Sequence, residues 1–113
     1  MAQAVLRIGP LPADALDAAE VFYAEWAPKV RLLLQSDALS VAIVIKTDEF
    51  LHDGWIRSAI QELARAFSGE RVNAVIGGDD TAIAATLAYL ERAPGVTGQC
   101  FQVDSVPVDE RAG

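Results

Sequence analysis

The stretch RVNAVIGG at residues 71–78, followed by VTGQCFQVD at residues 96–104, decides the fold of this chain. The first segment is apolar and rich in β-branched residues, which predicts a strand. Asp79-Asp80 can cap a helix, and Pro94-Gly95 can end it. Residues 99–103 predict a second strand, so this part of the chain reads as strand, helix, strand.

The residues before this segment continue the same alternation. Residues 4–8 predict a short strand, and residues 13–35 predict a long helix that Pro28 should kink or split. The run SVAIVI at residues 40–45 is almost wholly apolar, which is typical of a strand buried on both faces of a parallel sheet. Residues 53–67 carry apolar side chains at helical spacing and predict another helix.

Strands that alternate with helices predict an α/β fold. We expect a small four-stranded parallel sheet in the order β-α-β-α-β-α-β, with three helices and right-handed crossovers. Residues 1–104 are expected to form a single domain, and residues 105–113 a mobile C-terminal tail. Because four strands are few for an open sheet, one or more helix faces should be left with apolar surface to cover.

Composition narrows the function classes. The chain has 113 residues, 52% of them hydrophobic, a net charge of −7 and a single cysteine. This acidic balance argues against a nucleic-acid partner and against binding to anionic membranes. No stretch approaches the roughly 20 apolar residues of a membrane span, and the N-terminus lacks a secretory pattern. We therefore expect a soluble protein of the reducing cytoplasm.

Several motifs resemble those of short-chain dehydrogenases/reductases. Residues 71–78 resemble the family strand "RVNAVAPG", and residues 97–104 resemble its "TGQxxxVDGG". Leu63-Ala64-Arg65 lies where the family has "SLAxEL". Their order and spacing match the C-terminal half of the family only. The resemblance implies a truncated, Rossmann-like domain in which residues 18–34 form a helix of the kind that family members use in subunit contacts.

The sequence departs from the family at the positions that carry its chemistry. By the resemblance, the catalytic Tyr-x-x-x-Lys pair falls near Glu49 and Asp53. Carboxylates cannot replace a tyrosine whose pKa is lowered by a neighbouring ammonium group. The family's Gly-rich turn, which holds the cofactor pyrophosphate, has no counterpart in the 113 residues. We therefore expect no catalytic, cofactor-binding or metal-binding residues, no bound cofactor, and no enzyme of the family's type.

Polar residues after two of the strands are the candidates for a ligand site. The carboxyl ends of parallel strands line the ligand crevice of an open α/β sheet. Six residues lie there: Thr47, Asp48, His52, Asp53, Gly77 and Gly78. His52 with Asp48 or Asp53 could form an acid–base pair or a weak metal site. The plainer interpretation is a polar loop with helix caps, whose His52 can be replaced by alanine without loss of the fold.

Aromatic residues on the two long helices suggest a contact surface instead. The candidate interface consists of Phe22, Tyr23, Trp26, Trp55 and Ala59. Large aromatic side chains on neighbouring helices are typical of association surfaces. We therefore expect a non-catalytic module, a pseudoenzyme that forms a homodimer or a heteromer with a full-length dehydrogenase-like protein. The alternative is a small ligand-binding protein or enzyme that uses the loops at residues 46–53 and 77–80.

Overall fold

The computed structural model describes residues 3–36, 38–46 and 52–103. The predicted tail at residues 105–113 lies outside this part of the chain and stays a prediction. The elements follow one another as β1 (Gln3–Ile8), α1 (Ala15–Val21), the π-helical turn η1 (Phe22–Trp26), α2 (Ala27–Gln35), β2 (Ser40–Ile45), α3 (Asp53–Ala66), β3 (Arg71–Gly77), α4 (Asp80–Glu91) and β4 (Cys100–Val103).

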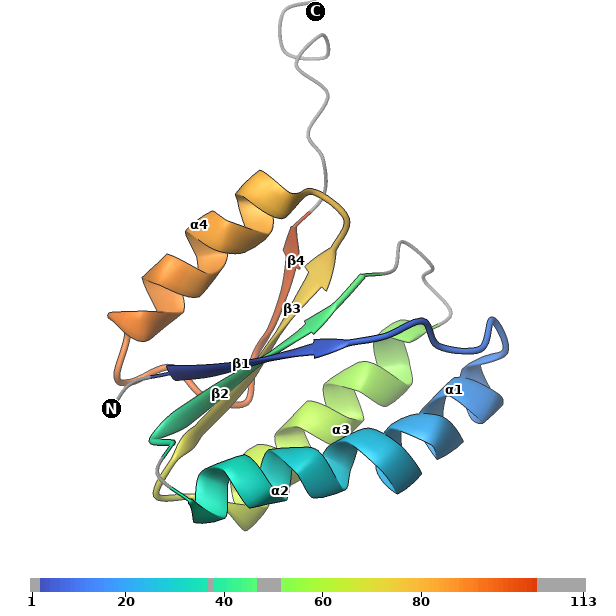
Figure 1. Cartoon of the computed structure of the whole chain (residues 1–113), viewed down its shortest axis with the longest axis horizontal. Coiled ribbons are helices and arrows are strands. Elements are labelled where there is room, and N and C mark those ends of the chain that lie inside the picture. The colour runs from blue at the N-terminus through green and yellow to red at the C-terminus, as the bar shows by residue number, and fades with distance from the viewer. Residues whose placement is uncertain (1–2, 37, 47–51, 104–113) are drawn as a thin grey trace, which may run out of the picture.

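The four strands form one parallel sheet in the order β1-β2-β3-β4, which confirms the predicted α/β, Rossmann-like fold. The register places Leu6 of β1 beside Ile43 of β2, and Ile43 beside Ala74 of β3. Helices α1, α2 and α3 cover one face of the sheet, and α4 alone covers the other (Figure 1).

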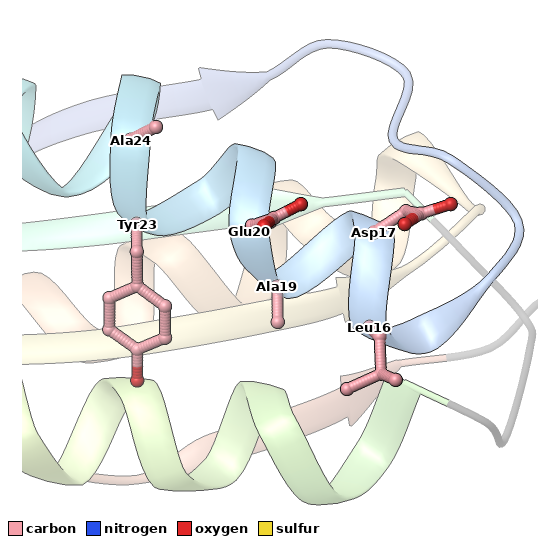
Figure 2. A pocket seen from close by; sticks show the side chains of 6 residues that line it. All are labelled: Leu16, Asp17, Ala19, Glu20, Tyr23 and Ala24. Atoms are coloured by element: carbon pink, nitrogen blue, oxygen red, sulfur yellow. The ribbon is translucent and has the colours of Figure 1, made fainter.

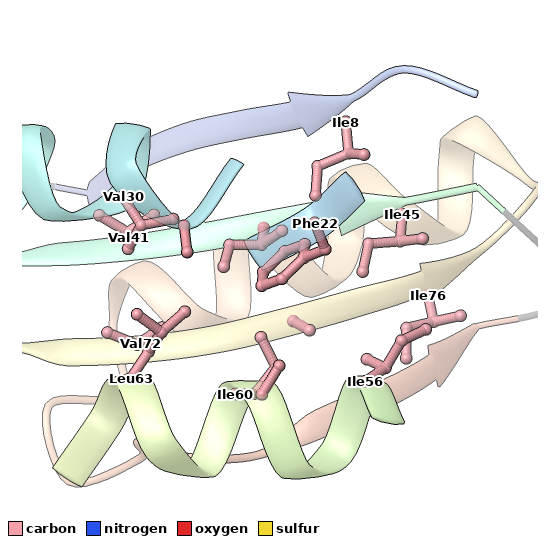
Figure 3. Close-up of a cluster of buried hydrophobic side chains, with 14 of the residues drawn as sticks. Ile8, Phe22, Val30, Val41, Ile45, Ile56, Ile60, Leu63, Val72 and Ile76 are labelled. Carbon is pink, nitrogen blue, oxygen red and sulfur yellow. The ribbon is translucent and has the colours of Figure 1, made fainter. Parts of the chain in front are cut away.

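Both faces of the sheet carry a hydrophobic core. The larger core lies under α1–α3 and contains Phe22, Ile60 and Val72 (Figure 3). All three side chains are fully buried. The smaller core lies under α4, where Ile83 and Leu90 pack against alternate residues of β2 and β3. Every residue of β2 is buried, as its near-continuous apolar run predicts.

The crossovers do not all have the hand that the sequence analysis expected. Successive strands step in one direction across the sheet. The first two connections pass over the face of Val41 and Ile43, but the third passes over the face of Ala42 and Val44. The third connection therefore has the opposite hand from the first two, so the expectation of uniformly right-handed crossovers is wrong. Strands buried on both faces require cover on both, and with three helical segments on one side, only α4 remains for the other.

Pro28 explains why the predicted long helix is divided. Proline has no backbone N–H and its ring clashes with the carbonyl four residues earlier. The chain widens into the π-turn η1 just before Pro28, and the N–H of Ala27 donates to the carbonyl of Phe22, five residues back. The predicted kink or split at Pro28 is confirmed, and the helix continues as α2.

The asparagine of the RVNAV strand has a structural role. Asn73 is buried and its amide Nδ2 donates to the carbonyl of Val96 at 3.0 Å, while its Oδ1 accepts from the N–H of Gln99 at 3.0 Å. Thr97 accepts from the N–H of Val72 in the same loop. These bonds fix the connection between α4 and β4, and they satisfy a polar group that would otherwise be costly to bury.

Membrane insertion finds no support among the helices of the described residues. None of them is long and apolar enough to cross a bilayer.

Candidate functional site

The carboxyl ends of the strands hold an ion pair that ties β2 to α4. Lys46 Nζ lies 2.8 Å from Asp80 Oδ1, and both side chains are exposed. The hydrogen bond from Lys46, and next its positive charge, lower the pKa of Asp80 from its ordinary value. An exposed pair of this kind contributes little to stability. The pair does neutralise the charge of Lys46, the residue that directly follows β2.

His52 is a buried structural residue rather than an exposed base. It is 3% exposed, and its Nδ1 accepts a hydrogen bond from the indole Nε1–H of Trp55 at 2.8 Å. The two rings meet edge to face with centroids 5.9 Å apart. Asp53 lies 3.7 Å from Arg57 on its own helix. Within residues 3–36, 38–46 and 52–103, no group of three or more histidine, cysteine or acidic residues is placed to hold a metal.

The other loop candidates divide between backbone roles and residues that the structure does not describe. Thr47 and Asp48 lie outside the described residues. Gly77 ends β3 with a φ of 153°, and Gly78 follows it with open space around its Cα. Asp79 caps α4 by accepting from the N–H of Ala82 at 2.9 Å. A carboxylate therefore occupies the helix N-terminus that an anionic ligand would use.

The most exposed large apolar side chain of the described residues, Leu16, lies on α1. Leu16 is 81% exposed and Tyr23 is 48% exposed. With Ala19 they form one line of side chains on α1 and η1, which we call the α1 stripe (Figure 2). The stripe lines an open hollow of about 770 Å³ together with Asp17 and Glu20. Single exposed apolar residues are common on protein surfaces, but these three lie together on one helical line.

Tyr23 joins the α1 stripe to α3. Burial raises the pKa of Tyr23 above its ordinary value, and the charge of Glu62 on α3 raises it further. Helix α1 contacts α3 directly, so the stripe and the outer side of α3 form one continuous surface. On α3 that surface is polar, with Glu62 Oε2 accepting from Arg65 at 2.9 Å.

The five residues predicted for the interface occupy different depths. Phe22 and Ala59 are 0% and 1% exposed, so they shape the helices from inside the core and offer a partner no surface. Trp55 is half-buried against Phe22, with ring centroids 5.4 Å apart. Trp26 is also half-buried and carries Lys29 over its ring, 4.3 Å from the centroid. Tyr23 is the one candidate of the five with an exposed side chain.

Leu16 and Ala19 lie outside the core, although both are apolar residues of the predicted first helix. Both fit the apolar periodicity of the helix, which suggests a side chain turned toward the core. The helix carries two apolar lines, however: Ala18 and Phe22 face the core, and Leu16 and Tyr23 face outward. The acidic residues Asp17 and Glu20, which lie between the apolar residues of the outer line, are the sequence signal that could have distinguished the outer line from the buried one.

Comparison with known proteins agrees with the motifs. A family model described as SDR-like, "Short chain dehydrogenase-like protein", matches residues 6–103, which is most of the chain. The chain therefore belongs to this short chain dehydrogenase-like family. No curated protein and no solved structure gave a match.

Proposed function

We propose that this chain is a non-catalytic assembly module of the short chain dehydrogenase-like family. It pairs through the surface formed by α1 and α3, either with a second copy or with a full-length dehydrogenase-like protein. The observation that carries the proposal is the α1 stripe, in which Leu16, Ala19 and Tyr23 leave apolar surface open along a hollow.

The residues at the strand ends support a non-catalytic role. Asp79 is engaged as a helix cap, Lys46 in an ion pair and His52 in a buried hydrogen bond. By the family resemblance, Glu49 and Asp53 stand where a catalytic tyrosine and lysine belong. A ligand at the loops 46–53 and 77–80 would have to displace these contacts, which makes the small-enzyme alternative the weaker one.

Hydrophobic burial supplies the driving force for pairing. At about 25 cal/mol per Å², covering several hundred Å² of apolar surface contributes several kcal/mol. Association must also offset the loss of translational and rotational freedom. The α1 stripe therefore needs a partner surface that extends across α3, whose polar side chains can form the rim of the contact.

The test is a charge placed in the α1 stripe. We expect Leu16→Glu to abolish pairing in multi-angle light scattering at tens of micromolar, measured alone and with a full-length dehydrogenase-like protein of the same genome. Leu39→Glu is the matched control, because Leu39 is 59% exposed but precedes β2 at the far end of the sheet. Pairing that survives Leu16→Glu, or a wild-type chain that forms neither complex, would contradict the proposal.

A further inference from the structure

Acidic side chains surround the α1 stripe, and their negative charge decides which kind of partner surface can bind there. The segment from residue 14 to residue 26 carries four carboxylates and no lysine or arginine. All four are exposed: Asp14, Asp17, Glu20 and Glu25. Asp17 and Glu20 line the hollow itself. The surface is therefore an apolar line inside an acidic border.

The neighbouring helix does not balance this charge. Helix α3 carries two arginines and two acids, and each arginine faces a carboxylate of its own helix. Arg57 lies 3.7 Å from Asp53, and Arg65 lies 2.9 Å from Glu62. Of the two cations on the next helical segment α2, Lys29 lies over the Trp26 ring, and Arg31 is exposed. The combined surface of α1, η1 and α3 therefore has a clear excess of negative charge.

A second copy would bring the same acidic border against this one. In a two-fold contact between identical patches, each patch meets itself, so α1 would approach α1 with like charges close together. Like charges opposed across an interface disfavour that pairing and act against the wrong partner. The border thus favours an oppositely charged surface.

We propose that the α1 stripe binds an amphipathic helix of a different protein, with leucine-like residues on one face and lysine or arginine beside them. This inference rests on the proposed assembly function and names the chemistry of its partner. Apolar side chains of the partner enter the hollow over Leu16, Ala19 and Tyr23, and its basic side chains meet Asp17 and Glu20. Helices with apolar anchors at i, i+3, i+4 and i+7 bind grooves in this way.

A synthetic helix provides the probe. A labelled peptide of about 14 residues, with leucines on one face and lysines on the other, is long enough to span α1 and η1. We expect saturable binding in fluorescence anisotropy, weakened by added salt because the charged contacts are screened. A peptide with glutamates in place of the lysines should not bind.

Charge reversal at the border is the decisive variant. Glu20→Lys should weaken binding by about tenfold or more, because it replaces an attraction with a repulsion at close range. Glu91→Lys on α4 is the matched control, since it changes the net charge equally at an exposed site on the other face of the sheet. Leu16→Ser should also weaken binding without changing the charge.

If the Glu20→Lys and Glu91→Lys variants bind the lysine peptide equally well, the inference is overturned. That result would mean that the peptide is attracted by the overall negative charge of the protein alone. Binding of the glutamate peptide as tightly as the lysine peptide would overturn it as well. A wild-type homodimer that Leu16→Glu dissolves would preserve the assembly function and overturn only the basic partner. If the lysine peptide does not bind and light scattering shows no complex, both the basic partner and the proposed assembly function are refuted.

Discussion

The backbone of Val103 leaves no room for a side chain at Gly77. A Cβ at this position would lie 1.8 Å from the carbonyl oxygen of Val103, and the φ of 153° also disfavours other residues. We predict that Gly77→Ala destabilises the fold by more than about 2 kcal/mol in urea unfolding, because β4 must move away from β3. Gly78→Ala has open space and should change the stability little. Equal effects of the two substitutions would show that the close approach has no energetic weight.

His52 has more influence on stability than its place in a polar loop suggests. Its burial changes the expectation that alanine is tolerated there. We predict that His52→Ala lowers the free energy of unfolding by about 2 kcal/mol, because the Trp55 N–H loses its acceptor and a cavity remains. His52→Asn, which can keep an acceptor oxygen, should lose less. An unchanged urea midpoint in His52→Ala, or a zinc-dependent rise in the wild-type midpoint, would contradict the structural role.

Individual residues were harder to predict than elements. Periodicity identified Phe22 and Leu16 alike as apolar helix residues, yet one is fully buried and the other is the most exposed large apolar residue in the described chain. The difference comes from the angular position of each residue against the sheet, which depends on how the helix docks. Two of the residues predicted for the interface, Phe22 and Ala59, therefore lie in the core, and an interface on these helices stays a prediction.

The elements themselves follow closely from local sequence. The SVAIVI run becomes a strand buried on both faces, Pro28 divides the first helix, and Asp79 caps α4. The side of the sheet on which α4 lies could not be predicted from the sequence of α4 and its neighbouring strands. It depends on which face α1–α3 have already covered, and that is a property of the complete packing.

The turn between β3 and α4 yields a prediction about cofactors. In dinucleotide-binding folds, backbone N–H groups at a helix N-terminus hold the pyrophosphate. Here the Asp79 carboxylate occupies the N-terminus of α4, next to the ion pair of Asp80 with Lys46. We predict no saturable binding of NAD(H) or NADP(H) in calorimetry at concentrations up to the high micromolar range. A dissociation constant in the micromolar range for either cofactor would refute this.

At the scale of the whole molecule, a four-stranded sheet has two unequal faces. Helices α1, α2 and α3 cover one face and α4 alone covers the other, yet the most exposed large apolar residue, Leu16, lies outside the core on α1 (Figures 1 and 2). The two cores thus fill both faces of the sheet, while α1 presents apolar surface that the described residues leave exposed. This contrast is the basis for proposing an assembly role rather than a chemical one.

Site-specific photo-crosslinking in the source cell tests this assembly role most directly. A photoreactive phenylalanine analogue replaces Leu16 in one variant and Leu39 in the other, and both sites are exposed apolar positions. We predict one discrete adduct from position 16 and none from position 39, with the cross-linked peptide mapping by mass spectrometry to a basic amphipathic helix of another protein. Absence of an adduct at position 16, or the same adducts from both positions, would contradict the account.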